Sequence, residues 1–178
     1  MKSDLRQILS LIPSETFRLA AKTTLLSAGE TASKVYFIKE GCVRLWYNND
    51  GKDITCQFFM PGSMVASFES FSKETPSEFT IETILSTTVE VYDKKDIDEY
   101  RLSHPEQLDI ALNFALDRAN NYIHLFLSRI KDSPKQRYKD LLEQAPEIVA
   151  SIPQHYIASY LGITPVSLSR IRKRISQK

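Results

Sequence analysis

The sequence predicts an α+β fold: an N-terminal β jelly-roll, one long helix, and a C-terminal helix-turn-helix. Short runs with strand-like alternation recur over residues 23–93, and residues 106–130 contain neither Pro nor Gly. The last part of the chain has the turn chemistry of two short packed helices. We therefore expect three segments, at residues 1–105, 106–131 and 132–178.

The N-terminal segment is expected to begin with a short amphipathic helix, because Leu5, Ile8, Leu9 and Ile12 recur at helical spacing. A second short turn is expected around Phe17 and Leu19, after Pro13. Extended runs follow, with a hairpin turn at residues 48–51 (Asn-Asn-Asp-Gly) and a break at Pro61-Gly62. Many short strands at close spacing favour a jelly-roll or barrel. The expected strands cover residues 35–38, 43–47, 54–59, 79–84 and 88–92.

The long helix carries a heptad-like row of apolar residues, which must be buried against something. Four further apolar residues lie off this row and are expected to pack on the β domain: Ile110, Phe114, Ile123 and Leu127. A helix that is apolar on two sides indicates a homodimer helix; the alternative is the core helix of a monomer. The row, and thus the expected dimer interface, is Leu108, Leu112, Ala115, Ala119, Tyr122 and Phe126.

The C-terminal segment is expected to begin a helix at residues 136–144, with Pro134 in its first turn and Pro146 after its end. The most specific stretch is residues 151–172. Ala158 is small where a second helix must approach, and Gly162 supplies the left-handed conformation after the first helix. Thr164 can cap the second helix and Pro165 suits its first position, while Leu168 and Ile171 can pack back. This pattern predicts a helix-turn-helix.

Charge is distributed unevenly along the chain. Residues 1–130 hold 14 basic and 18 acidic residues, whereas residues 131–178 hold 9 basic and 4 acidic residues. A basic module joined to an acidic one is typical of a tethered polyanion binder, although a charged tail is often only solvated. Small residues at the front of the second helix would let it enter the major groove, with arginine reaching guanine. The alternative is a plain helical hairpin with a solvated charged face.

Two motifs resemble the CRP/FNR regulators, whose cyclic-nucleotide-binding-like β domain precedes a dimer helix and a winged helix-turn-helix. Gly29-Glu30-x4-Val35-Tyr36-Phe37-Ile38-x2-Gly41-x-Val43 resembles the glycine-framed hairpin of that β domain. Ile157-Ala158-x2-Leu161-Gly162-x-Thr164-x2-Ser167-Leu168-Ser169-Arg170-Ile171 resembles its helix-turn-helix. The resemblance implies a homodimer on an inverted-repeat operator in double-stranded DNA, with RNA polymerase as a further partner.

By that resemblance Arg170 matches the base-contacting arginine, and Gln154 and His155 match backbone-contacting positions. Pro165 and Val166 stand where the family often has charged residues, so a different operator is expected. The sequence ends at Lys178, so we expect the wing to be short or missing. The expected DNA-binding residues are Gln154, His155, Thr164, Pro165, Val166, Ser167, Ser169, Arg170, Arg172, Lys173 and Arg174.

The resemblance also implies an effector site in the β domain, but this sequence lacks the residues with which relatives bind the phosphate of cyclic AMP. Relatives use a Gly-Glu pair before a short helix and a later Arg-Ser pair; here Gly62 precedes Ser63, and the arginine position is Ser77, followed by Glu78. We therefore expect no ordinary cyclic AMP binding. The cavity is then empty, filled by Phe68, Phe71 and Phe79, or used by another ligand. The candidate pocket residues are Gly62, Ser63, Met64, Ser77, Glu78 and Thr80.

Other chemistries find little support in the sequence. Cys42 and Cys56 are too few for an iron–sulfur cluster and are expected to be reduced, with a redox switch as the open alternative. His104, His124 and His155 show no haem pattern.

We expect no metal, no cofactor and no catalytic residues. The polar start and the lack of a ~20-residue apolar run predict a cytoplasmic protein without a membrane segment. The leading hypothesis is a DNA-binding transcription regulator. The alternative is an effector-sensing module whose C-terminal helices bind a protein.

Overall fold

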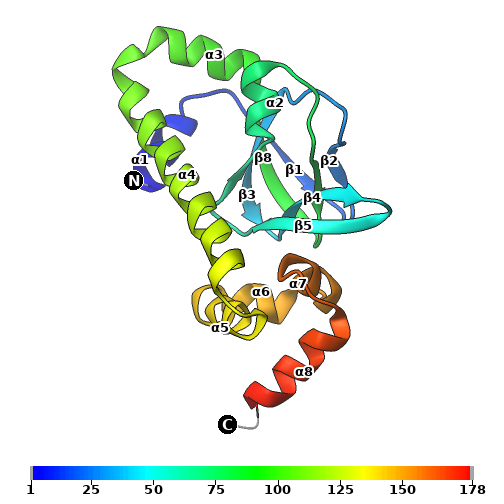
Figure 1. The fold of residues 1–178 in the computed structure, drawn as a ribbon. Helices are drawn as coiled ribbons and strands as arrows, with labels where there is room; N and C mark the ends of the chain where they lie inside the picture. Colours follow the sequence, from blue (N-terminus) through cyan, green and yellow to red (C-terminus); the bar gives the residue numbers. More distant parts are fainter. Residues whose placement is uncertain (1, 177–178) are drawn as a thin grey trace.

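The computed structural model describes residues 2–176 and has a β domain, a long helix and a C-terminal helical group (Figure 1). The expected α+β fold with an N-terminal antiparallel β domain is confirmed. The strands are β1 (Glu15–Leu19), β2 (Thr24–Leu26), β3 (Lys34–Glu40), β4 (Val43–Asn49), β5 (Lys52–Phe59), β6 (Met64–Val65), β7 (Thr80–Thr83) and β8 (Thr87–Asp93). The helices are α1 (Lys2–Leu9), α2 (Phe68–Lys73), α3 (Lys94–Ser103), α4 (Leu108–Lys131), α5 (Pro134–Gln144), α6 (Pro146–Ser151), α7 (Gln154–Tyr160) and α8 (Pro165–Ser176).

The β domain consists of two four-stranded antiparallel sheets, in the orders β1-β8-β3-β6 and β2-β7-β4-β5. Apart from the β4–β5 hairpin, neighbours in each sheet come from distant parts of the chain, as in a jelly-roll. Alternating strand residues point between the sheets, where Ile38, Val43, Ile81 and Val89 are completely buried. Burial of these side chains supplies the driving force for closing the two sheets on one another.

Two turns depend on left-handed backbone. The expected hairpin between β4 and β5 is present, with Asp50 and Gly51 at φ values of 50° and 82°. Between β3 and β4, Gly41 has a φ of 86°, and a Cβ there would lie 2.4 Å from the carbonyl oxygen of Ser86. A side chain at Gly41 would therefore push apart the turn that joins the two sheets.

The first twenty residues differ in part from expectation. The amphipathic helix is present as α1, but the expected turn around Phe17 and Leu19 is wrong. These residues lie in β1, which pairs along its whole length with β8. That pairing partner is about seventy residues away, so local pattern could not indicate it.

Helix α1 is anchored to the β domain by an ionic cluster. The Arg6 guanidinium donates to both carboxylate oxygens of Glu90, with Nη2 2.9 Å from Oε1. Lys39 approaches the same carboxylate at 3.1 Å, and the Tyr92 hydroxyl donates to it at 2.9 Å. The Arg6 hydrogen bond is the largest cause that lowers the pKa of Glu90, to about 2.

Helix α4 has two contrasting faces. Ile110 and Phe114 are half-buried beside the β domain, as expected, and Phe114 contacts Phe68 with ring centroids 6.4 Å apart. The expectation that Ile123 and Leu127 also pack there is wrong, since they are 54% and 43% exposed. At this end α4 leaves the β domain and its inner face meets the C-terminal helices instead.

The C-terminal helices form their own core against the lower edge of the β domain. Tyr138, Leu141 and Ile148 are buried there together with Cys42 and Phe58 from the sheets. Helix α5 ends at Gln144, as expected, but Pro146 also begins α6. Its missing N–H costs nothing at that first position. No helix in the described range is long and apolar enough to cross a membrane.

Candidate nucleic-acid interface

The first helix of the expected helix-turn-helix is α7, and it ends in a Schellman motif. Gly162 adopts a φ of 68°, its N–H donates to the Ser159 carbonyl at 2.9 Å, and the Ile163 N–H donates to the Ala158 carbonyl at 3.0 Å. The left-handed residue reverses the chain and satisfies carbonyls that the helix leaves free. The sequence prediction for Gly162 is confirmed in its conformation.

The second helix, α8, begins as its residue types predict. The Thr164 hydroxyl accepts from the Ser167 N–H at 3.2 Å, and Pro165 is the first helical residue. Such a cap satisfies one of the free N–H groups at the helix start. The turn between the two helices is thereby fixed at both ends.

The two helices pack through a small apolar contact surface. Leu168 and Ala158 are completely buried, and Ile157 and Leu161 are each 1% exposed. Ala158 allows α8 to approach α7 closely, and Ile171 packs against the same core. These contacts set the orientation of the outward face of α8.

Helical geometry separates the outward residues of α8 from the packed ones. At about 100° per residue, Leu168, Ile171 and Ile175 share one face, and Val166, Ser169, Arg170 and Lys173 share the opposite one. Val166, Ser169, Arg170, Lys173 and Arg174 are exposed, with Val166 at 61%.

Arg172 and Ser167 are half-buried and flank the packed face instead. The structure therefore brings together most of the expected α8 residues on one surface and separates Arg172 and Ser167 from them. Gln154 and His155 are also exposed, at the start of α7.

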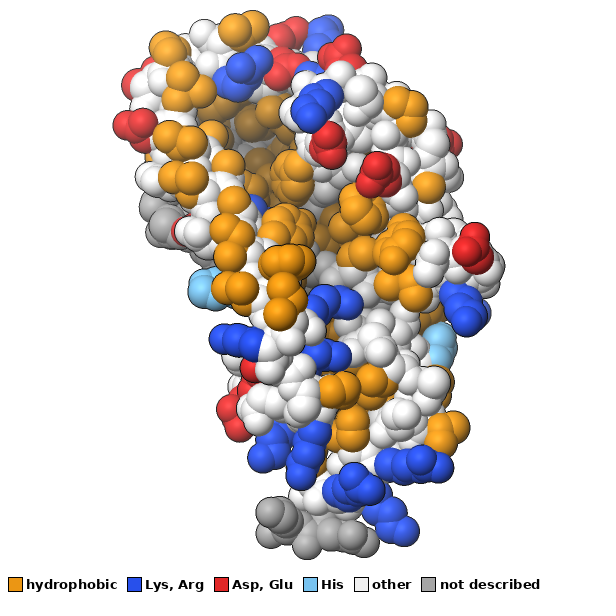
Figure 2. Space-filling model, in the orientation of Figure 1, with side chains coloured by type: hydrophobic (Ala, Val, Ile, Leu, Met, Phe, Trp, Pro, Cys, Tyr) orange, Lys and Arg blue, Asp and Glu red, His pale blue; other side chains and the backbone are white. Residues whose placement is uncertain are grey.

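The outward face of α8 is strongly cationic. No acidic residue follows Glu147 in the sequence, and no described ion pair involves Arg170, Lys173 or Arg174. Figure 2 shows Lys and Arg side chains gathered at the α8 end of the molecule, whereas acidic side chains lie mostly over the β domain. A groove-sized helix with free cations on one side has the shape and charge to contact a polyanion.

The β4–β5 hairpin holds α7, a contact that sequence reasoning missed. The Ser159 hydroxyl accepts from the Thr55 N–H at 3.0 Å and donates to the Asp53 carbonyl at 2.8 Å. The rings of Phe58 and Tyr160 lie 5.2 Å apart. Ser159 and Tyr160 lie in the quoted motif, but no local pattern indicates that their partner is a strand about one hundred residues earlier.

The six candidate effector residues fall into two groups. Gly62, Ser63 and Met64 line a cleft of about 250 Å³ beneath α4. Ser77 and Thr80 are buried elsewhere, with the Ser77 hydroxyl 2.8 Å from that of Ser67, while Glu78 is exposed.

The short helix α2 does not follow Gly62-Ser63 directly. Strand β6 pairs with β3 after Gly62-Ser63, so the short helix α2 begins only at Phe68. The residues directly before it are Ala66 and Ser67, and neither is acidic.

The two cysteines differ in exposure: Cys42 is buried and Cys56 is half-buried. Cys42 is completely buried, which raises its pKa to about 12, and burial also raises the pKa of Cys56. A thiol that stays protonated is a poor nucleophile, so neither environment favours redox chemistry. Within residues 2–176, no cluster of three or more His, Cys, Asp and Glu side chains is arranged to hold a metal ion.

Comparison with known proteins agrees with this architecture. The cyclic nucleotide-binding domain family matches residues 16–104, half of the chain. No curated protein sequence matches the chain significantly.

Solved structures show the same fold over most of the chain. FixK2 from Bradyrhizobium japonicum has a TM-score of 0.80 at 17% identity, covering 93% of this chain and 86% of its own. The c-di-GMP responsive global regulator CLP from Xanthomonas campestris has a TM-score of 0.70 at 13% identity, and the match covers 99% of this chain and 92% of that one. A CooA mutant from Carboxydothermus hydrogenoformans has a TM-score of 0.68 at 16% identity, and the match covers 96% of this chain and 79% of that one.

An antiparallel β domain, a long helix and a C-terminal group of short helices define the architecture. The chain belongs to the cyclic nucleotide-binding domain family.

Proposed function

We propose that this protein is a sequence-specific DNA-binding transcription regulator of the CRP/FNR type. The observation that carries the proposal is the outward face of α8, where Arg170 and Lys173 are exposed and free of acidic neighbours. Small Ser169 on the same face leaves room for the helix to approach base edges. Arg170 would read a base, while Lys173 and Arg174 would contact phosphates.

The functional unit we propose is a homodimer formed through α4. Leu112, Tyr122 and Phe126 are 57%, 42% and 64% exposed in the single chain, and the row of hydrophobic side chains along α4 is visible in Figure 2. Leu116 and Ile130 extend it, at 52% and 68%. Covering this row against a second copy would remove it from water and place two copies of α8 symmetrically. The operator would then be an inverted repeat, with RNA polymerase as the further partner.

Control by cyclic AMP is not part of the proposal. The short helix α2 follows Ala66-Ser67, and the buried hydroxyls of Ser67 and Ser77 satisfy one another where a phosphate would need cations. Phe71 and Phe79 pack against the core between the sheets. This arrangement supports the proposal that the β domain lacks the groups needed to bind the phosphate of cyclic AMP.

Selection of bound fragments from random duplex DNA tests the function. We expect enrichment of an inverted repeat, and binding whose logarithm falls linearly with the logarithm of salt concentration. The double variant R170E/K173E should lose binding, whereas K95E, at an exposed site on α3, should not. Failure to enrich any sequence, or binding unaffected by R170E/K173E, would contradict the proposal.

A further inference from the structure

A cleft of about 680 Å³ lies between β5, α4 and the C-terminal helices. Its apolar lining includes the rings of Phe58 and Tyr160, whose centroids lie 5.2 Å apart. Leu125, Leu141 and Ile148 contribute further apolar surface. A volume of this size accommodates a small organic molecule.

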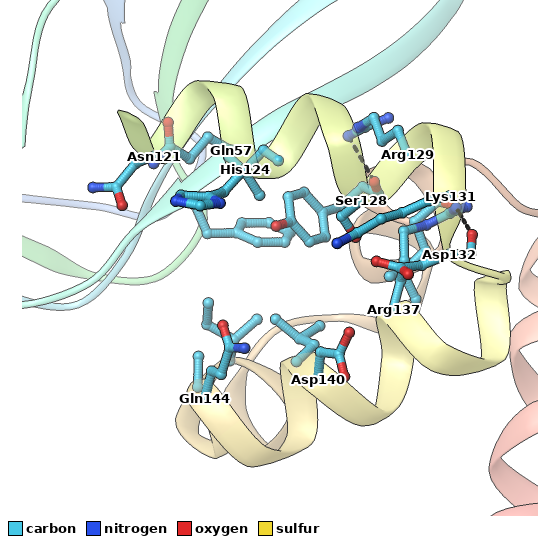
Figure 3. Close-up of a pocket in the computed structure, with 17 residues that line it drawn as sticks. Gln57, Asn121, His124, Ser128, Arg129, Lys131, Asp132, Arg137, Asp140 and Gln144 are labelled. Atoms are coloured by element: carbon cyan, nitrogen blue, oxygen red, sulfur yellow. Dashed lines mark hydrogen bonds between the residues drawn. The ribbon is translucent and has the colours of Figure 1, made fainter. Parts of the chain in front are cut away.

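Several polar groups of the cleft lie toward its two ends, while Asp140 and Gln144 lie on the α5 wall (Figure 3). Arg129, Lys131 and Arg137 cluster at one end, where α4 passes into α5, and the amide side chains of Gln57 and Asn121 lie at the other (Figure 3). This arrangement matches a ligand with an anionic group, an apolar body and a hydrogen-bonding group.

Two acids also line the cleft, but one of them is engaged. The Asp140 carboxylate accepts from the Gln136 amide at 2.7 Å, and Asp132 lies beside the cationic end. Lys131 is exposed and has no ion-pair partner within residues 2–176. Arg137 Nε and Gln57 Oε1 are buried without a hydrogen-bond partner among the described residues. Because buried polar atoms normally find partners, these two mark places that a ligand can satisfy.

The two arginines also hold the first helix of the helix-turn-helix. Arg129 donates to the Tyr160 carbonyl and Arg137 to the Leu161 carbonyl, at 2.8 Å and 2.7 Å. Both carbonyls belong to the C-terminal end of α7, where cations are favoured by the helix dipole. An anion binds a guanidinium more strongly than a neutral carbonyl does. A ligand in the cleft would therefore compete with α7 for these groups.

The cleft is placed so that dimerisation leaves part of it open. At about 100° per residue, two of the α4 residues that line it, Asn121 and Ser128, lie roughly opposite the exposed row at Ala119 and Phe126, whereas Arg129 lies beside that row. A second copy packed on that row therefore leaves the wall formed by Asn121 and Ser128 uncovered.

We propose that this cleft binds a small organic anion, a carboxylate or a phosphate ester with an apolar body, and that its binding loosens α7. The anionic group pairs with Lys131 and Arg137, and the apolar body lies over Phe58 and Tyr160. The effect on α7 rests on the proposed DNA-binding function, whereas binding itself does not.

Isothermal titration calorimetry on the full chain tests the site with three probes: phenyl phosphate, phenylacetate and the neutral phenylacetamide. At least one of the two anions should bind. The affinity of the amide should be at least roughly tenfold lower, because the amide cannot form a charge-assisted hydrogen bond. Which anion binds more tightly distinguishes a phosphate ester from a carboxylate. Binding of no probe, or of the amide as tightly as the anions, overturns the proposal.

Variants locate the binding. Lys131→Gln should lower the affinity for the anion by roughly threefold to tenfold. Gln144→Trp, at an exposed position on the cleft wall, should block it. Lys135→Gln, which removes an exposed charge at the start of α5 outside the cleft, is the matched control and should bind like the wild type. Undiminished binding to Gln144→Trp overturns the site.

Coupling to α7 is read separately, from DNA affinity with and without the bound probe. A shift in wild type that is absent in Gln144→Trp supports the loosening of α7. An unchanged DNA affinity overturns that part alone. If the probe binds but the protein never binds DNA, the proposed function fails and the ligand site stands.

Discussion

The guanidinium of Arg44 lies 4.3 Å from the ring centroid of Tyr156, and this contact joins β4 to α7. On its other side Arg44 lies 4.6 Å from the ring of Trp46. Its side chain is only 3% exposed, and it pairs with Asp53 at 3.1 Å and Glu82 at 3.3 Å. The hairpin thus holds α7 through a buried cation between two aromatic rings.

Removing this cation should destabilise the whole protein. Arg44→Met keeps much of the volume but leaves the poorly exposed carboxylate of Glu82 without its partner, so we expect a loss of about 2–4 kcal/mol in the free energy of unfolding. In a double-mutant cycle, Arg44→Met and Tyr156→Leu should be coupled by about 1–2 kcal/mol. Urea denaturation measures both. The control cycle combines Arg44→Met with Tyr100→Leu, on α3, and the losses in unfolding free energy of these two variants should add. If the coupling between Arg44 and Tyr156 is as small as in this control, the contact does not contribute to stability.

The outward and inward arginines of α8 should behave differently. Arg170→Ala should cost roughly 1–3 kcal/mol in operator binding and relax one base position, because its side chain faces outward. Arg172→Ala is the comparison, since Arg172 is half-buried on the flank of the packed face and should alter sequence preference little. Binding to a panel of single-base operator variants separates the two. Equal relaxation by both variants would remove Arg170 from its reading role.

A charge on the exposed row of α4 should disrupt the dimer but not the fold. Leu112→Glu and Tyr122→Glu place carboxylates at positions 57% and 42% exposed in the single chain, so the monomer tolerates them. In a dimer the same carboxylates would be buried unpaired, and we expect dimerisation at least roughly tenfold weaker. Analytical ultracentrifugation provides the measurement. Asn113→Glu adds the same charge on another face and should leave the dimer intact.

The sequence predicted best those features that local chemistry determines. Gly162 and Thr164 act where they were expected, because a left-handed turn and a helix cap depend on a few adjacent residues. The hairpin at Asp50-Gly51 is predicted for the same reason.

Features that depend on distant partners were missed. Phe17 and Leu19 form a strand only because β8 supplies its hydrogen bonds, and Ser159 is tied to a hairpin far earlier in the chain. Helix α3 has no buried residue, so no apolar period indicates it. The same limit applies to α4, where period alone could not show that Ile123 lies beyond the reach of the β domain. The short wing stays a prediction, because residues 177–178 lie outside the described part.

Cys42 should be inert in the native state. Its burial and raised pKa, about 12, keep the thiol protonated and covered at neutral pH. A thiol-reactive disulfide reagent at pH 8 should therefore label it only at the rate of unfolding, and much faster in urea. Rapid native labelling at Cys42, identified by peptide mass, would restore the redox-switch hypothesis.

The ion pair between Arg6 and Glu90 should make the free energy of unfolding depend on pH in the acidic range. The pKa of Glu90 falls from its usual 4.5 to about 2, chiefly because Arg6 hydrogen-bonds the ionised form. A lowered carboxyl pKa contributes stability that is complete above about pH 4.5 and is lost as the pH falls toward 2. Because the Arg6 side chain is 40% exposed, solvent screens the pair, and we expect about 1–2 kcal/mol. Urea denaturation of wild type and Glu90→Gln at pH 7 and pH 3 measures this contribution. The variant should be less stable at pH 7, and the difference should be smaller at pH 3, where part of this contribution is lost. A difference that stays constant between the two pH values would mean that Glu90 does not titrate through its pair with Arg6, and that α1 is held by the packing of Leu9 and Ile12 alone.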